Sequence, residues 1–316
     1  MKAIKINEFG SADVLSFEEV PEPVAVNKQL KIQVEGAAVG AADILLRKGV
    51  YPGMTQANFI PGIEAAGTVI SVGDQADKQW VGRRVFAITG LGAYAEQVIV
   101  DEDMAIIIPD ELTVNEALGL GVNALVADYS LHRSGLIQDD HVLIRGAGGG
   151  IGSMAVQLAI ANSFEVSVIA SSPQKKQDLH NLGVRRFLTM DEAKAGTLEF
   201  NAVVDPVAGE DIDTFVELLK ENGSYLINGV AGGFPFPDFG MSWLKRFQRS
   251  LTLSCFSLNS IPPKEIRGRM DKIFNLAKNG KIKPLIGETF PLENAIAAHI
   301  LLETGISFGK LILINK

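Results

Sequence analysis

Cysteine is almost absent from this sequence, and its scarcity excludes several kinds of site. The 316-residue chain has one cysteine, Cys255, so it can form neither an internal disulfide nor a metal site built from several cysteines. Cys255 falls in an apolar stretch, where we expect it to be buried. The four histidines lack the spacing of metal ligands, which predicts surface or core positions and no metal centre. They are His132, His141, His180 and His299.

Long apolar runs and basic stretches are also missing. No segment offers the roughly 20 apolar residues of a membrane-spanning helix. Residues 1–8 alternate like a β-strand and lack the apolar block and cleavage site of a signal peptide. The net charge of −8 argues against nucleic acid as the main partner, because phosphate binding needs a basic face. We therefore expect a cytoplasmic protein that has neither a nucleic acid nor a membrane as partner.

The sequence is rich in apolar residues, which make up 47% of it and are enough to form sizeable cores. Its length predicts about two domains. Residues 1–110 read as short strands interrupted by glycine and proline. Residues 31–35 alternate polar and apolar, as a half-buried strand does. From Thr113 onwards, where residues 113–116 form a possible capping box, helices and strands alternate.

The alternating region predicts a defined set of elements. The expected strands are residues 141–145, 165–170, 202–205, 224–228 and 251–258. The expected helices are residues 151–162, 173–182, 211–221 and 263–279. Because the strands are almost continuously apolar, they predict a parallel sheet with helices on both faces.

A glycine-rich turn joins the first of these strands to its helix. The dinucleotide-binding fingerprint G-x-G-x-x-G fits with Ala147, Gly149 and Gly152 in its three small-residue positions. Small residues allow a tight turn, let the backbone approach a pyrophosphate, and let the helix pack close to the strand. An ordinary glycine-rich turn is the alternative, but a strand precedes and a helix follows, as the motif requires. The expected cofactor-binding residues here are Ala147, Gly148, Gly149, Gly150, Ile151 and Gly152.

The segment after the second strand indicates which dinucleotide is bound. A carboxylate about 20 residues beyond the glycines would bind the ribose hydroxyls of NADH, whereas basic groups accommodate the 2′-phosphate of NADPH. Here the sequence offers Ser171, Ser172, Lys175 and Lys176, with no acidic residue. These residues predict NADPH, the alternative being a solvated start of a helix.

Short motifs spread over the whole chain resemble one family. They are similar to the zinc-free quinone oxidoreductase branch of the medium-chain dehydrogenase/reductase superfamily, to which zeta-crystallin is related. The matching segments are residues 1–4, 8–10, 18–21, 43–52, 61–69, 72–73, 82–85, 93–96 and 309–311. Each is modest alone, but their order and spacing are specific.

The resemblance implies an α/β fold with two domains. Residues 1–118 and 285–316 would form a GroES-like β-rich domain on the substrate side. Residues 119–284 would form a Rossmann-type, doubly wound parallel sheet that binds NADPH, and the active site would lie in the cleft between the two domains. The family commonly forms homodimers by pairing edge strands, for which residues 251–258 are the candidate.

The positions of the zinc ligands in other members of the superfamily are changed here. Those members carry a cysteine shortly before the position of Asp43 and a histidine between glycine and glutamate, where this chain has residues 40–42 (Gly-Ala-Ala) and Ile63. The four-cysteine lobe is absent as well. Without zinc to polarise an alcohol, a conjugated acceptor is favoured, because its charge spreads onto a distant oxygen. The implied substrate is a quinone or an enone.

Tyr51 is the expected side chain on the substrate, because related enoyl reductases are thought to use the matching tyrosine as a proton or hydrogen-bond donor. The alternative is that Tyr51 only packs in a turn. Asp43 is a second catalytic candidate. Two departures from the branch make the nicotinamide pocket more apolar. Gly40 replaces a usual asparagine, and Val126 replaces a usual threonine.

The remaining cofactor contacts are carried over from the family. Strand ends at the carboxyl edge of such sheets bind ligands. The residues so placed are Val207 and Ala208 at the adenosine ribose, Val126, Gly229 and Val230 beside the nicotinamide, and Phe256 and Ser257 after the last strand.

Two alternative functions remain open. An enoyl-thioester reductase would need basic groups for a phosphopantetheine arm, and Lys245, Arg246 and Arg249 are the suggestive cluster. A non-catalytic NADPH-binding protein, of the crystallin or RNA-binding kind, is disfavoured by the acidic balance.

Overall fold

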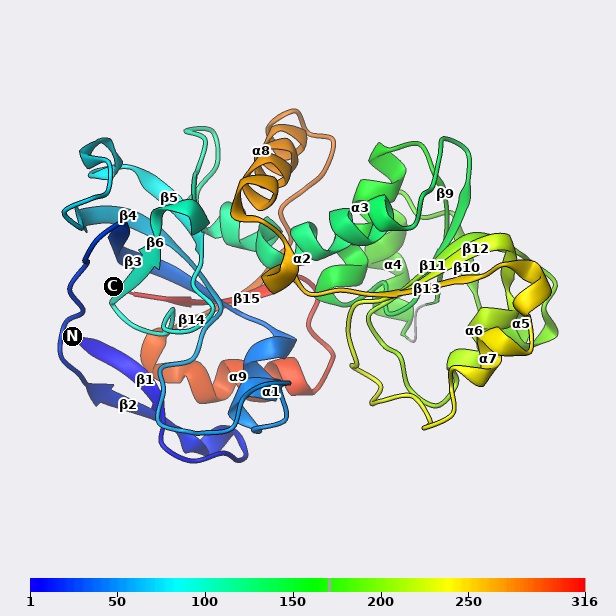
Figure 1. Ribbon diagram of the computed structural model, residues 1–316, viewed down its shortest axis with the longest axis horizontal. Coiled ribbons are helices and arrows are strands. Elements are labelled where there is room, and N and C mark those ends of the chain that lie inside the picture. The colour runs from blue at the N-terminus through cyan, green and yellow to red at the C-terminus, as the bar shows by residue number, and fades with distance from the viewer. Residues whose placement is uncertain (170–171, 316) are drawn as a thin grey trace. The chain divides into compact units, whose positions relative to one another are not determined.

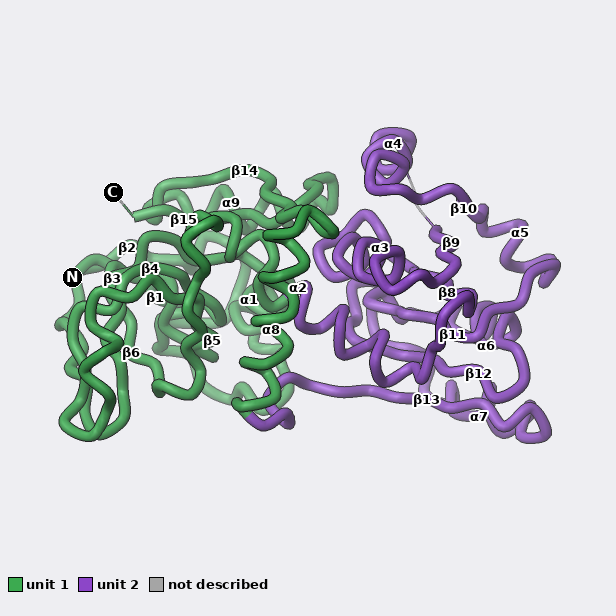
Figure 2. Tube along the Cα trace, turned by 90° about the horizontal axis from the view of Figure 1, so that it is seen from above, with its two compact units in different colours: residues 1–122, 263–316 green, residues 123–262 purple. Residues whose placement is uncertain are grey.

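The computed structural model describes residues 1–169 and 172–315. These residues form two compact units, which Figure 2 shows in different colours. Unit 1 comprises residues 1–122 and 263–316, and unit 2 comprises residues 123–262. Unit 2 is therefore one continuous stretch of chain that interrupts unit 1.

Unit 1 is built on antiparallel strands. Its elements are β1 (Lys2–Ile6), β2 (Leu15–Glu19), β3 (Gln29–Val39), α1 (Ala41–Arg47), β4 (Glu64–Val72), β5 (Arg84–Ile88), β6 (Gln97–Asp101), β7 (Ala105–Ile107), α8 (Pro263–Lys278), β14 (Ile286–Pro291), α9 (Ala295–Glu303) and β15 (Lys310–Ile314). The larger sheet has the order β14-β15-β3-β4-β5-β7, with β6 on β3, and β1 pairs with β2. The last strand, β15, therefore returns to the middle of the sheet, where it pairs with β3.

The polar and apolar alternation in β3 has its predicted consequence. Leu30, Ile32 and Val34 are fully buried, and they contribute to a core that also takes side chains from β1, β4, β5 and β15. This unit agrees with the β-rich domain that the resemblance implies for the first part of the chain.

Unit 2 contains a wholly parallel sheet. Its elements are β8 (His141–Ile144), α3 (Gly150–Ala161), β9 (Glu165–Ile169), α4 (Pro173–Asn181), β10 (Arg186–Leu188), α5 (Met190–Ala195), β11 (Phe200–Asp205), α6 (Ile212–Glu217), β12 (Leu219–Ile227), α7 (Met241–Leu244) and β13 (Thr252–Cys255). The strand order is β10-β9-β8-β11-β12-β13, which is the Rossmann order. Figure 1 shows α3 on one side of this sheet and α6 and α7 on the other. The predicted doubly wound sheet is confirmed.

The helix α2 (Val114–Arg133) runs across the sequence boundary between the units. Gly121 interrupts it with φ 43° and ψ −148°, values that are not helical. A side chain at Gly121 would place its Cβ 2.3 Å from an oxygen of Glu64, so only glycine fits. Thr113 caps the start of the helix as predicted, accepting a hydrogen bond from the Glu116 amide at 3.2 Å.

Several boundaries differ from those expected. The helix predicted over residues 211–221 ends at Glu217, and β12 begins at Leu219, because a register irregularity in the pairing with β11 brings Leu219 beside Phe200. The last strand of the sheet is shorter than residues 251–258. Cys255 is exposed and not buried, because β13 is the edge strand of its sheet and pairs only with β12.

Replacing Gly67 by alanine is expected to destabilise unit 1. Its Cβ would lie 2.0 Å from the carbonyl oxygen of Gln33, where β3 makes an irregular step opposite Gly67. We expect the free energy of unfolding to fall by about 2–3 kcal/mol. Denaturant titration of Gly67→Ala measures this loss.

Gly268→Ala is the matched control, because Gly268 is exposed in α8 and no atom lies within 4 Å of the added carbon. It should raise stability by about 0.5–1 kcal/mol through helix propensity. Equal effects of the two variants would contradict the steric argument.

Candidate functional site

The glycine turn of unit 2 has the geometry that the motif requires. β8 ends at Ile144, Gly146 takes φ 55°, and Gly149 stands at the N-terminal cap of α3. A Cβ on Gly152 would lie 2.3 Å from the Gly146 carbonyl oxygen, so the helix reaches the turn only because Gly152 has no side chain. The first amides of α3 have no partner within the helix and form an anion-binding end.

A pocket of about 240 Å³ opens beside this turn. It lies at the carboxyl ends of β8, β9 and β11, where the strand order reverses and such sheets bind their ligands. Its lining residues are Arg145, Gly146, Gly148, Gly149, Ile169, Lys175, Met190, Val207 and Phe215. The structure thus brings the predicted glycines, Lys175 and Val207 together.

Two of the residues expected to select NADPH, Ser172 and Lys175, lie at the start of α4. The Ser172 hydroxyl accepts a hydrogen bond from the Lys175 amide at 3.2 Å. The Lys175 side chain passes over the glycine turn, since a Cβ on Gly148 would lie 2.5 Å from its Cδ. Burial lowers the pKa of Lys175. Ser171, which was predicted with them, lies outside the described residues.

A buried cation stands directly before the glycine turn, and the sequence did not single it out. Arg145 donates to Asp205 Oδ2 at 2.7 Å and to Asp211 Oδ1 at 2.8 Å, and its guanidinium lies 3.8 Å from the centre of the Phe215 ring. Burial opposes its charge, but Asp205, Tyr225 and Asp211 raise the pKa of Arg145 above its usual value. The sequence could have indicated this cluster, because a charged residue at the end of an apolar strand needs a partner when it is buried.

Asp205, which binds Arg145, also holds the loop after β11. Asp205 Oδ1 accepts the amides of Val207 at 2.8 Å and Ala208 at 2.9 Å, and Ala208 adopts φ 53°, a conformation unusual for alanine. The loop after β12 approaches closely, since a Cβ on Gly229 would lie 2.6 Å from the Pro206 carbonyl oxygen. The predicted residues Val207, Ala208 and Gly229 therefore share one edge of the sheet, and Val230 follows directly.

Val126 belongs to a short polar chain that the sequence did not reveal. The Ser130 hydroxyl donates to the Val126 carbonyl at 2.7 Å, and Asn228 Nδ2 donates to Ser130 Oγ at 2.7 Å. These bonds fix the orientation of the Asn228 amide. Its Oδ1 is buried, with no hydrogen-bond partner in the described part of the chain. Asn228 follows the end of β12 and precedes the predicted Gly229.

The two candidates after β13 have local contacts. The Phe256 ring lies 6.0 Å from the Tyr129 ring. The Arg133 guanidinium lies 5.2 Å from the centre of the Phe256 ring. The Ser257 hydroxyl accepts the Asn259 amide at 3.2 Å and so caps a short 3-10 turn. Phe256 is half-buried and Ser257 is exposed.

Asp43 lies in unit 1, in a buried and charged setting. It is 0% exposed, and its Oδ2 accepts the Gly40 amide at 2.8 Å at the start of α1. Nearby, Lys310 and Glu64 form a buried ion pair at 2.6 Å. Burial and, less strongly, the charge of Glu64 raise the pKa of Asp43 to about 7, with Gly40 and Lys310 acting against the shift. Asp43 therefore keeps its proton to a higher pH than an exposed aspartate does.

A second buried chain of polar side chains runs through unit 1. Arg47 is wholly buried and binds both oxygens of Glu303 at 3.0 Å. His299 lies between Arg47, at 3.4 Å from Nδ1, and the Tyr94 hydroxyl, at 3.1 Å from Nε2. Burial lowers the pKa of His299 to about 3, so the ring is neutral and fills a core position. Because arginine only donates, Nδ1 accepts and Nε2 carries the hydrogen.

Tyr51 also belongs to unit 1. It is half-buried in the turn that follows α1, and its amide donates to the Leu45 carbonyl at 3.2 Å. Asp43 and Tyr51 thus belong to the same short helix and the turn after it. The pair Glu64 and Lys310 was not singled out from the sequence, although a lysine opening an apolar strand could have indicated a buried partner.

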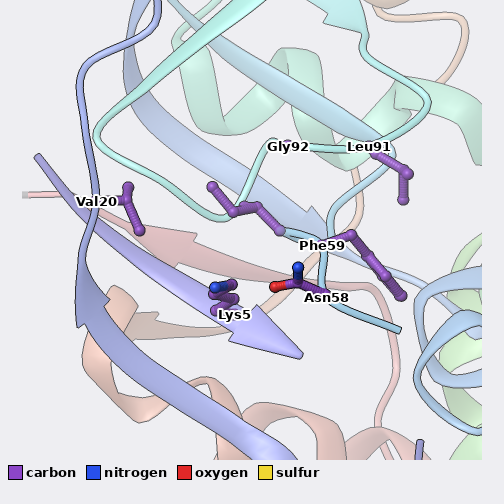
Figure 3. A pocket seen from close by; sticks show the side chains of 7 residues that line it. Lys5, Val20, Asn58, Phe59, Leu91 and Gly92 are labelled. Carbon is purple, nitrogen blue, oxygen red and sulfur yellow. The ribbon is translucent and has the colours of Figure 1, made fainter. Parts of the chain in front are cut away.

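A separate hollow of about 390 Å³ lies in unit 1 (Figure 3). It is lined by Lys5, Val20, Asn58, Phe59, Ile60, Leu91 and Gly92. None of the residues expected from the sequence lines this hollow, so it stands apart from the candidate site.

The described residues 1–169 and 172–315 contain no group of three or more His, Cys, Asp or Glu side chains able to hold a metal ion. Within these same ranges no helix has both the length and the apolar character needed to cross a membrane.

Comparisons with known proteins point to one family. Residues 26–110 match the alcohol dehydrogenase GroES-like domain, and residues 181–313 match the zinc-binding dehydrogenase family. Mouse quinone oxidoreductase is 27% identical over 99% of this chain and 98% of its own length. The structure of a mycobacterial protein in complex with NADPH is 26% identical, covers all of both chains and gives a TM-score of 0.92.

A far longer relative is also similar. It is a phenolphthiocerol/phthiocerol polyketide synthase of Mycobacterium tuberculosis, which is 30% identical over 98% of this chain, although the chain spans only 14% of that relative. The fold, the glycine turn and these relatives define the class of medium-chain dehydrogenases and reductases. The chain belongs to the medium-chain dehydrogenase/reductase superfamily, in its zinc-independent branch of quinone oxidoreductase-like proteins, as its motifs predicted.

The raised pKa of Asp43 predicts a pH dependence of stability. The folded state keeps the Asp43 proton up to about pH 7, whereas the unfolded chain releases it near 3.8. The folded state therefore binds more protons within this window, and stability falls as the pH rises through it. Relative to Asp43→Asn, the free energy of unfolding of the wild type should decrease by up to about 1.4 kcal/mol per pH unit.

Chemical denaturation at several pH values between about 4 and 7 measures this difference. Asp110→Asn is the control, because the Asp110 side chain is fully exposed and should leave the slope of the wild type unchanged. A wild type and an Asp43→Asn variant with parallel pH profiles would refute the assignment.

Proposed function

We propose that the chain binds NADPH on unit 2 and transfers a hydride from it to a quinone or another conjugated carbonyl compound, such as an enone. The observation that carries the proposal is the glycine turn, which opens onto the pocket of about 240 Å³ at the reversal of the strand order. Free amides and the dipole at the start of α3 favour a pyrophosphate there. The similarity to a mycobacterial protein solved with NADPH supports the same choice.

The phosphates and the adenosine are assigned to one group of residues. Residues 147–152 would hold the pyrophosphate, and Val207 and Ala208 would border the adenosine ribose. Ser172 and Lys175, with Ser171 expected beside them, would accept the 2′-phosphate. Lys175 supports this role because it lines the pocket and crosses the glycine turn.

The nicotinamide end is assigned to a second group. Val126, Gly229, Val230, Phe256 and Ser257 would surround the ring. The exposed hydroxyl of Ser257 already caps a turn, so its contribution would come from the backbone.

The acceptor is assigned to unit 1. Bound NADPH supplies the hydride, and the protein must orient the acceptor and stabilise the charge that develops on its oxygen. A conjugated acceptor lightens this task because the charge spreads. We propose the Tyr51 hydroxyl as the group on the acceptor oxygen, and Asp43 as a proton-holding side chain on the neighbouring helix. Residues 1–118 and 285–316 would be the substrate-side domain, and residues 119–284 the cofactor domain.

A homodimer is proposed through the edge strand β13. Thr252, Leu253 and Cys255 are exposed on this strand, whose outer backbone groups are open for pairing with a second copy. Light scattering tests the proposal, since a species of 33.9 kDa would be a monomer.

A second candidate function is favoured by the similarity to a polyketide synthase. It is the reduction of an enoyl thioester. The basic cluster that could hold a phosphopantetheine arm is partly neutralised, however, because Arg246 pairs with Asp213 at 3.1 Å and Arg249 lies 3.6 Å from Glu199.

The direct test follows the near-ultraviolet absorbance of NADPH with benzoquinone, phenanthrenequinone, a simple enone and crotonyl-coenzyme A, each repeated with NADH. Turnover of a quinone or enone, with NADPH preferred and a chelator without effect, would support the main proposal. Turnover of the thioester alone would move the function to enoyl reduction. NADPH binding without any turnover would favour a non-catalytic binding protein.

Lys175→Met is expected to raise the KM for NADPH about tenfold and to change the KM for NADH little, because it removes a cation next to the 2′-phosphate. Lys176→Met is the matched control. Lys176 is exposed on the same helix and does not line the pocket, so its loss should leave the preference unchanged. Steady-state kinetics with both cofactors measure this. An equal loss with NADPH and NADH would contradict the assignment.

A further inference from the structure

Arg145, Asp205 and Asp211 form a cluster of charged side chains (the Arg145 cluster) that the dinucleotide fingerprint, which needs only small residues, does not require. Arg145 stands at the point where β8 leaves the sheet, immediately before the small residues of the turn. It is 5% exposed, yet it lines the pocket of about 240 Å³. Asp205 and Asp211 both bind it, so the cluster carries one more negative than positive charge.

We propose that Arg145 is a positioning residue for the dinucleotide. It ties the glycine turn to the loop between β11 and α6, and it balances two carboxylates that would otherwise repel the phosphates of the cofactor. This inference rests on the proposed binding of NADPH to unit 2.

The contacts of Arg145 reach both sides of the pocket. Its own backbone amide donates to Val204 of β11 at 3.0 Å, and its Nη1 donates to the Ala208 carbonyl at 3.1 Å. Ala208 is the residue held at φ 53°, and Val207 beside it forms a pocket wall against Gly146. One side chain therefore sets the distance between the turn and the loop that would border the ribose.

Stability alone does not explain this arrangement. A buried ion pair is commonly no more stabilising than apolar side chains of the same volume, because both charges lose their hydration. Here the Phe215 ring already covers one face of the guanidinium, so apolar side chains in place of the whole ion pair would have an apolar surface to pack on. The charge matters instead for a ligand that brings several negative charges to the same edge of the sheet.

The electrostatic effect has a defined sign. Removing the guanidinium leaves the buried carboxylate of Asp205 without its cation, so that only the neutral donors Val207, Ala208 and Tyr225 offset its negative charge beside the pocket. Removing the charge of Asp211 has the opposite effect, because Arg145 then serves one carboxylate and its field reaches the pocket. Asparagine at position 211 keeps a carbonyl oxygen that can accept the same hydrogen bond.

The test compares Arg145→Met, Arg145→Lys and Asp211→Asn with the wild type. Fluorescence titration gives the Kd of NADPH at low and high salt, and steady-state kinetics give KM and kcat. We expect Arg145→Met to raise Kd and KM by about tenfold or more, with kcat at saturating NADPH within about twofold of the wild type. Arg145→Lys should restore most of the affinity, and Asp211→Asn should lower Kd about threefold at low salt and less at high salt.

Asp213→Asn is the matched control for charge. Asp213 lies two positions further along, pairs with Arg246 and does not touch Arg145, so its variant should bind NADPH as the wild type does. If Arg145→Met does not fold, Asp211→Asn decides, because the Asp211 side chain is 43% exposed and we expect its replacement by asparagine to leave the fold intact.

Tighter binding by Asp211→Asn, with rescue by Arg145→Lys, supports the inference. Unchanged or weaker binding by Asp211→Asn, or an Arg145→Lys as impaired as Arg145→Met, overturns it and leaves a structural role only. A wild type that does not bind NADPH would instead refute the proposed function, and the two failures are thus distinct.

Discussion

The approach of α3 to the end of β8 is the constraint on which the site depends. Gly152 lies so close to the Gly146 carbonyl that any side chain would push the helix away from the turn. With the helix in place, its free amides face the pocket at the reversal of the strand order. The loops after β11 and β12 follow at the same edge of the sheet, and backbone hydrogen bonds join them, such as that from the Gly232 amide to the Val207 carbonyl at 2.7 Å. The shape of this edge of the sheet in unit 2 therefore depends first on close backbone contacts, to which the Arg145 side chain adds its own.

The two units use buried polar groups in different ways. In unit 2 the charges of Arg145 and Asp205 lie at the edge of the sheet, next to the pocket. In unit 1, Lys310 and Glu64 pair inside the β-rich core, and His299 is kept neutral between Arg47 and Tyr94. Buried charges of this kind need their partners, because an unpaired one costs several kcal/mol. Each unit thus has polar contacts that specify its own fold.

The sequence predicted the fold class and most of the elements, because the signals were local. Apolar strands, the glycine turn and the cap at Thr113 are read from neighbouring residues, and all were confirmed. The strand β10 and helix α5 were missed although Thr189 and Glu192 form a capping box, with Thr189 Oγ accepting the Glu192 amide at 3.2 Å. Both elements are short and lack the periodicity on which longer ones are recognised.

The remaining features depend on partners that are distant in the chain. Arg145 pairs with Asp205, which is 60 residues away in the sequence, and Lys310 pairs with Glu64, which is 246 residues away. No spacing rule connects such residues, so their roles emerged only from the folded chain. Cys255 was misjudged for a related reason: an apolar strand predicts burial, but its place at the edge of the sheet depends on the order of all six strands.

The interruption of unit 1 by unit 2 has a consequence for how the chain is made. All six strands of the parallel sheet follow one another between residues 123 and 262, so unit 2 can fold on the ribosome as a continuous stretch. Unit 1 must wait. Until β15 has been synthesised, residues 36–39 of β3 lack a partner strand on one side and Glu64 lacks the lysine of its ion pair. The nascent protein therefore passes through a stage in which its cofactor unit is complete while its β-rich unit is exposed to misassociation.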